Sequence, residues 1–83
     1  MKINIVIADD HDLVGKSVAA LLTSIPDFEV VGQCENGRDL IELVERLRPN
    51  VAIVDLGMPR MNGVEVARRL QTNRSTRVII LSG

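Results

Sequence analysis

The feature that most constrains the fold is a set of short apolar runs, rich in β-branched residues, that recur along the whole chain. Three of them, Ile3–Ala8, Val51–Val54 and Val78–Leu81, have the composition of strands buried on both faces of a parallel sheet. A fourth segment, Phe28–Cys34, alternates only weakly between apolar and polar residues, which is typical of an edge strand. The sequence therefore predicts four strands.

Three intervening segments have apolar residues at helical spacing. The first is capped by Asp12 and stopped by Pro26, the second follows a turn at Asn36-Gly37, and the third runs from about Gly63 to Gln71. The predicted order βαβαβαβ favours right-handed crossovers and a parallel sheet with helices on both faces, which is the α/β class. The residues that define the spacing are Val14, Val18, Leu21, Leu22 and Ile25, then Leu40, Ile41, Val44 and Leu47, and finally Val66, Ala67 and Leu70.

Composition excludes several classes of protein. The 83 residues allow one small domain, and a net charge of −1 gives no global attraction for nucleic acid or membranes. Phe28 is the only aromatic residue, so a stacking platform for single-stranded nucleic acid is excluded. The single cysteine, Cys34, excludes an internal disulfide and suits a reducing compartment. A strand pattern begins at once after Met1, and no apolar run is long enough to span a bilayer, so we expect a cytoplasmic protein without a membrane segment.

Acidic residues follow two of the apolar runs. Asp9 and Asp10 come directly after Ile3–Ala8, and Asp55 comes directly after Val51–Val54. Ligands of open α/β sheets bind beyond the carboxyl ends of the strands, so three carboxylates are expected at one edge if these strands are neighbours. Like charges at that distance favour a hard divalent cation. Each residue also has a simpler interpretation as a loop or helix cap, and for Asp9 and Asp10 capping is compatible with metal binding.

These motifs resemble the receiver domain of two-component response regulators. The residues that carry the resemblance are Asp9-Asp10, then Asp55-Leu56-Gly57-Met58-Pro59 with Gly63, and then Val78 to Gly83. The opening Ile7-Ala8-Asp9-Asp10-His11 is most similar to the subfamily in which the receiver precedes a helix-turn-helix DNA-binding domain. The resemblance implies a flavodoxin-like fold with strand order 2-1-3-4. It also implies that residues 1–83 form a partial receiver domain, truncated before a fifth strand.

The resemblance assigns roles to individual residues. It implies that Asp55 accepts a phosphoryl group from a phosphohistidine on a sensor histidine kinase, and that Ser82 is the hydroxyl switch residue. Mg²⁺ would be bound by Asp10, by Asp55 and by the backbone carbonyl of Gly57, with Asp9 acting through a water molecule. Such a domain signals through its own phosphorylation and is not expected to turn over an external substrate. DNA contact is expected only through an output domain outside these residues.

Alternative interpretations stay open at this point. A Mg²⁺-dependent phosphohydrolase with an aspartyl nucleophile usually carries a second aspartate two residues after the first, and Gly57 at that position disfavours it. In a metal-independent interaction domain, Asp9, Asp10 and Asp55 would be present but would bind no metal ion. Ser82 also suits a plain turn, and His11 needs no role beyond helix entry.

The resemblance also predicts two consequences of truncation. The family lysine that holds the phosphoryl group is placed at the end of the fifth strand, and neither Lys2 nor Lys16 matches it, so we expect metal binding to be retained and phosphorylation to be impaired. The run Val78–Leu81 would form a flat apolar edge. We therefore expect a homodimer or higher oligomer, formed by contact or by exchange of the terminal strand and helix.

Overall fold

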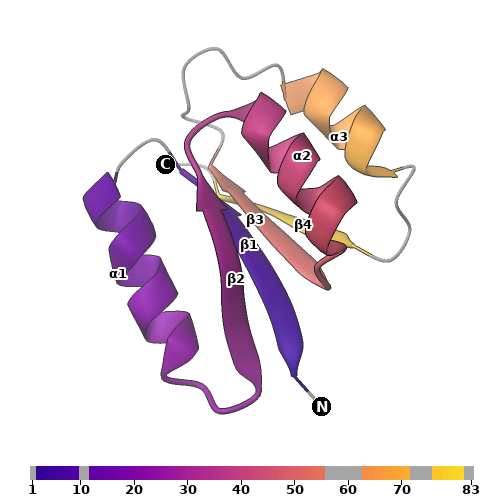
Figure 1. Cartoon of the computed structure of the whole chain (residues 1–83). Helices are drawn as coiled ribbons and strands as arrows, with labels where there is room; N and C mark the ends of the chain where they lie inside the picture. The colour runs from indigo at the N-terminus through magenta and orange to yellow at the C-terminus, as the bar shows by residue number, and fades with distance from the viewer. Residues whose placement is uncertain (1, 10–11, 56–62, 72–75, 82–83) are drawn as a thin grey trace.

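The computed structural model describes residues 2–9, 12–55, 63–71 and 76–81. Within these residues the strands and helices alternate, and all strand pairs are parallel in the order β2-β1-β3-β4 (Figure 1). The predicted α/β class, strand order and edge position of the second strand are confirmed. The elements are β1 (Ile3–Ala8), α1 (Asp12–Thr23), β2 (Phe28–Cys34), α2 (Gly37–Leu47), β3 (Val51–Asp55), α3 (Gly63–Gln71) and β4 (Arg77–Leu81).

The sheet separates two apolar layers. Helices α2 and α3 cover one face, and α1 covers the other face over β1 and β2 (Figure 1). Because successive strand residues point to opposite faces, β1 and β3 contribute to both layers. The first layer contains Val6, Ala8, Leu40, Val44, Ala52, Val54, Val66 and Leu70, and the second contains Ile5, Ile7 and Ile53, packed with residues that include Val18, Ala19 and Leu22.

Two predicted helix boundaries are corrected. Helix α1 ends at Thr23, because the main-chain N–H of Ile25 bonds to the carbonyl of Leu22 in a tighter turn instead of continuing the helix. Leu21, within α1, and Ile25, beyond its end, are both exposed, although their spacing suggested a buried face. Asn36 is not part of a separate turn. It is the N-cap of α2, and its side chain accepts a hydrogen bond from the main chain of the first helical turn.

A network of hydrogen bonds fixes the register at the amino-terminal end of the sheet. Asn50 bonds Asn4 of β1 through both its side chain and its main chain, and its carbonyl accepts from the N–H of Arg77 at 2.9 Å. The hydroxyl of buried Thr76 donates to the carbonyl of Pro49 at 2.6 Å. β4 therefore begins at Arg77, one residue before the predicted start. With one end aligned in this way, the carboxyl ends of β1, β3 and β4 lie together at the opposite edge.

The two outer strands differ. The pairing of β1 with β2 shifts register between Ile5 and Val6, so that Val31 has no β1 partner of its own. The pairing of β3 with β4 is regular over five residues. Three apolar residues of β4 are well exposed, namely Val78 at 36%, Ile79 at 48% and Ile80 at 50%.

Candidate functional site

Asp9 and Asp55 lie at the carboxyl ends of neighbouring strands. The last β1–β3 register pair is Ala8 with Val54, so Asp9 and Asp55 occupy the next step on each chain. Adjacent strands are about 4.8 Å apart. Strand alternation assigns both aspartates to the same side of the sheet as Ile7 and Ile53. The structure thus brings together two of the three carboxylates that the sequence singled out.

The two carboxylates differ in their exposure to solvent. Asp9 is only 8% exposed, while Asp55 is partly exposed. The main-chain N–H of Asp9 donates to the carbonyl of Cys34 at 3.0 Å, which extends the β1–β2 ladder one residue beyond Ala8. Asp9 is therefore held on the β2 side of the edge, and Asp55 is held by pairing with Leu81 of β4.

The remaining predicted site residues, Asp10, Gly57 and Ser82, lie outside the described residues. Within the described part of the chain, no group of three His, Cys, Asp or Glu side chains is arranged to hold a metal ion. Carboxylate oxygens from two adjacent strands are nevertheless the donor type that Mg²⁺ prefers, since Mg²⁺ takes one or two protein carboxylates and keeps several waters. The chemistry of Asp9 and Asp55 fits such an ion.

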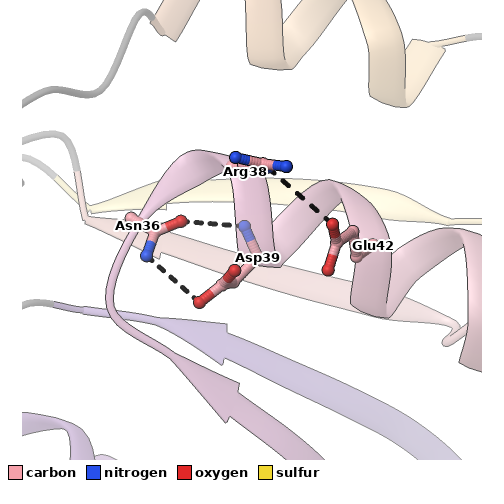
Figure 2. Close-up of polar contacts among 4 residues, drawn as sticks. All are labelled: Asn36, Arg38, Asp39 and Glu42. Atoms are coloured by element: carbon pink, nitrogen blue, oxygen red, sulfur yellow. Dashed lines mark hydrogen bonds and ion pairs between the residues drawn. The ribbon is translucent and has the colours of Figure 1, made fainter.

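The polar start of α2 is built next to the end of β2. Asn36 Oδ1 accepts from the Asp39 main-chain N–H at 2.8 Å, and Asn36 Nδ2 donates to Asp39 Oδ2 at 3.1 Å (Figure 2). This cap satisfies one of the unpaired N–H groups at the start of the helix. The Arg38–Glu42 ion pair, at 3.9 Å, is highly exposed and contributes little to stability. The cap thus fixes where α2 begins, with two residues between the end of β2 and the first residue of α2.

Cys34, the last residue of β2, lies between Asp9 and the capped start of α2. Burial, which disfavours the thiolate, raises the pKa of the Cys34 thiol from 9.0 to about 11. A backbone hydrogen bond at Asn36 opposes this shift, and the charges of Asp39 and Glu35 add to it. The thiol is therefore protonated at neutral pH. The hydrogen bond between the Asp9 N–H and the Cys34 carbonyl was not predicted from the sequence.

A parallel sheet of order 2-1-3-4, with helices on both faces and acids at its carboxyl edge, defines a flavodoxin-like α/β domain. The family model of the response regulator receiver domain matches residues 5–83, and the chain belongs to this family.

Two relatives that are named as regulatory proteins illustrate the sequence similarity. The chain is 45% identical over 82 residues to the transcriptional regulatory protein DegU of Brevibacillus brevis, covering 98% of this chain and 35% of the relative. It is 39% identical over 79 residues to the nitrate/nitrite response regulator protein NarL of Escherichia coli K12, covering 94% and 37%. The chain thus spans little more than a third of the length of these relatives.

Solved structures agree with the fold. The signal receiver domain of the putative response regulator NarL from Mycobacterium tuberculosis has a TM-score of 0.89 at 34% identity, with 98% of this chain and 66% of that chain covered. The response regulator domain of Thermotoga maritima CheB has a TM-score of 0.90 at 30% identity, with 99% and 61% covered. Both similarities cover almost the whole of this chain.

None of the helices in the described ranges combines the length and the apolar character that a bilayer crossing needs.

Proposed function

We propose that the chain is a phosphoacceptor module in which Asp55 receives a phosphoryl group from a phosphohistidine of a sensor histidine kinase. The observation that carries the proposal is the Ala8–Val54 register pair, after which Asp9 and Asp55 follow on adjacent strands. A carboxylate oxygen of Asp55 forms the new O–P bond, the P–N bond of the phosphohistidine breaks, and the imidazole nitrogen keeps the electron pair. Membership of the receiver family supports this assignment.

We propose further that Asp9, Asp10, Asp55 and the carbonyl of Gly57 hold Mg²⁺, with Asp9 acting through water. When bound, the ion supplies positive charge beside the phosphoryl oxygens. The part of the proposal that rests on described residues is the pair of carboxylates, Asp9 buried and Asp55 partly exposed, at one sheet edge. Ser82 is proposed as the hydroxyl that bonds the phosphoryl group, on the resemblance alone.

The same family membership supports a proposal about the cellular setting. We propose a cytoplasmic signalling role, with a sensor kinase as partner and with any DNA contact made through an output domain, as the transcription-regulator names of relatives suggest. No turnover of an external substrate is expected.

We also propose that the chain self-associates through β4. The support is the regular, apolar edge of this strand, on which Ile79 and Ile80 are about half exposed. Exchange of the terminal strand and helix is one form that this association can take.

Labelling with acetyl phosphate in the presence of Mg²⁺ tests the phosphoacceptor assignment. We expect intact-mass measurement to detect one added phosphoryl group on the natural chain and none on Asp55→Asn. Asp27→Asn is the matched control, because Asp27 is an exposed aspartate in the turn before β2. Chelation of Mg²⁺ should abolish labelling.

Labelling of Asp55→Asn at the rate of the natural chain would contradict the proposal. Mg²⁺ titration of the same variants separates the phosphoacceptor proposal from a metal-independent interaction domain. Only the phosphoacceptor proposal predicts that Asp55→Asn binds Mg²⁺ more weakly. The impaired phosphorylation predicted for these 83 residues stays a prediction, which the initial labelling rate measures.

A further inference from the structure

The outer side of β4 presents main-chain groups to a further strand. The N–H of Arg77 bonds to the carbonyl of Asn50 at 2.9 Å, so the main-chain groups of Arg77 point toward β3. Main-chain groups of successive strand residues point to opposite sides, and those of Val78 and Ile80 therefore point away from the sheet. Of the described helices, none packs extensively on β4, and Val78 and Ile80 are 36% and 50% exposed.

A second copy of β4 fits this edge in antiparallel orientation. Two identical strands related by two-fold symmetry run antiparallel, and residues opposite each other then lie on the same face of the joined sheet. One register pairs all five residues of β4 with those of the other copy. In that register Ile79 faces Ile79 of the partner subunit. Val78 faces the partner's Ile80, so the outward main-chain groups of both meet, and Arg77 faces the partner's Leu81.

Arg77 and Asp55 lie on the same face of the sheet. Arg77 is the register partner of Val51, which packs with the apolar layer under α1, and Asp55 follows Val51 by four residues on the same strand. An even spacing along a strand keeps side chains on one face. Asp55 is also the register partner of Leu81. In the antiparallel pair, the partner's Arg77 therefore lies two strands away from Asp55, at the same level and on the α1 side.

The separation and the charges suit an ion pair. The Cα atoms of Asp55 and the partner's Arg77 would be about 9 Å apart, a gap that the long arginine side chain and the aspartate side chain span together. Arg77 is exposed, and within the described part of the chain its side chain makes no ion pair. Guanidinium groups bind carboxylates and phosphoryl oxygens through parallel N–H groups. Two-fold symmetry forms this contact twice in each pair of chains.

We propose that β4 pairs with β4 of a second copy, and that the partner's Arg77 forms part of the phosphorylation site, beside the Asp55 carboxylate and the oxygens of a phosphoryl group attached to it. The inference rests on the proposed function and deepens it, because it assigns the register of self-association and a residue supplied by the second copy. Phosphoryl transfer is accelerated chiefly by positioning and by positive charge, so the pair is the form that is phosphorylated most rapidly.

Mixing two variants tests whether Arg77 acts on the other copy. Asp55→Asn retains the cation without the acceptor, and Arg77→Gln retains the acceptor without the cation. With acetyl phosphate and Mg²⁺, at concentrations where the natural chain associates, we expect Arg77→Gln alone to be labelled about tenfold more slowly than the natural chain. Excess Asp55→Asn should restore most of this rate, and intact-mass measurement shows which chain carries the phosphoryl group.

Two controls accompany the mixture. A chain with both Asp55→Asn and Arg77→Gln should give no rescue, because it supplies neither group. Arg46→Gln removes the same charge from the exposed end of α2, on the other face of the sheet, and should be labelled at the natural rate. Labelling of Arg77→Gln at the natural rate, or equal rescue by the doubly substituted chain, would overturn the proposal.

Cross-linking tests the register without phosphorylation. In a Cys34→Ala background, Ile79→Cys would place two thiols opposite each other in a non-hydrogen-bonded pair, with Cα atoms about 4.5 Å apart, which suits a disulfide. Ile80→Cys is the matched control, since the partner's Val78 faces it. We expect oxidation to link Ile79→Cys into a covalent dimer and to leave Ile80→Cys unlinked. Equal linkage of the two variants would overturn the register.

The dissociation constant of the oligomer separates this inference from the proposed function. Asp55→Asn and Arg77→Gln should each raise that constant about fivefold, and the doubly substituted chain should raise it no further, because both changes remove the same contact. Additive effects would contradict the contact. If the natural chain is not labelled at all, the phosphoacceptor role is wrong, while the dissociation constants still decide whether the partner's Arg77 lies beside Asp55.

Discussion

Asn4 and Asn50 are joined by two hydrogen bonds across 46 residues of sequence. The N–H of Asn4 donates to Asn50 Oδ1 at 2.8 Å, and the carbonyl of Asn4 accepts from the N–H of Asn50 at 2.9 Å. The pair connects the start of β1 to the segment that leads into β3. It thus fixes, from the far end of the sheet, the register that brings Asp9 beside Asp55.

Substitution Asn50→Ala should lower the free energy of unfolding by about 1 kcal/mol, because the Asn4 N–H loses its side-chain acceptor in a solvent-accessible place. Urea denaturation followed by far-UV circular dichroism measures this change. Asn50→Asp keeps an oxygen acceptor and is the control; we expect it to retain most of the stability. Equal losses in the two variants would show that the side-chain acceptor is unimportant.

Substitution Thr76→Val should cost more, about 1–3 kcal/mol, because it leaves the Pro49 carbonyl without its donor at a buried position. Thr76→Ser retains the hydroxyl and loses only the methyl group, so its loss should be smaller. Denaturation midpoints of the two variants provide the comparison. A Thr76→Ser variant as unstable as Thr76→Val would assign the effect to the methyl group instead of the hydrogen bond.

The raised pKa of Cys34 predicts a loss of stability at alkaline pH. The unfolded thiol loses its proton near pH 9.0, whereas the folded thiol keeps it until about pH 11. Between these values the unfolded state binds fewer protons, so the contribution of Cys34 to stability is complete below pH 9 and falls as the pH rises to 11, by at most about 1.4 kcal/mol per pH unit. The Cys34→Ala variant lacks this component, so the difference in denaturation midpoint between the two chains, followed as a function of pH, measures it.

The same protonation predicts slow chemistry at the thiol. At pH 8, a thiol-specific reagent should react much more slowly with Cys34 in the folded chain than with Cys34 in the unfolded chain, because the thiolate is the reactive form. Ellman's reagent with and without urea measures the ratio. Equal rates in the two states would contradict the raised pKa and the burial that causes it.

Self-association through β4 predicts that Ile79→Thr raises the dissociation constant of the oligomer roughly tenfold, since it removes apolar area at the exposed edge while keeping a β-branched residue. Light scattering over a concentration series measures it. Leu21→Gln removes an even more exposed apolar side chain from α1 and should have no effect. A natural chain that is monomeric at high micromolar concentration would refute the self-association itself.

The four strands could be predicted from the sequence because their apolar runs are short, β-branched and bounded by turn residues. The order of the strands in the sheet could not be predicted in the same way. Alternation of strands and helices predicts a parallel sheet but does not distinguish 2-1-3-4 from other orders, and the family resemblance supplied that choice. The neighbouring positions of Asp9 and Asp55 depend on it directly.

Details that depend on single hydrogen bonds could not be predicted in this way. The end of α1 at Thr23 is set by a tight turn around Leu22, and Asn36 caps α2 instead of forming a separate turn. The Cys34–Asp9 bond joins residues of separate strands, so no local pattern signals it. Of the predicted site residues, Asp10, Gly57 and Ser82 lie outside the described residues, and their roles stay predictions.

Val31 of β2 has no pairing partner in β1, so the two edges of the sheet, β2 and β4, differ in regularity. An extra residue increases local twist, which makes the outer side of β2 a poor template for a further strand. If growth of the sheet is blocked at β2 and open at β4, two copies can join only through the same strand, around a two-fold axis. Such an arrangement closes on itself as a pair, and the irregularity at Val31 then protects the chain against open-ended fibre growth.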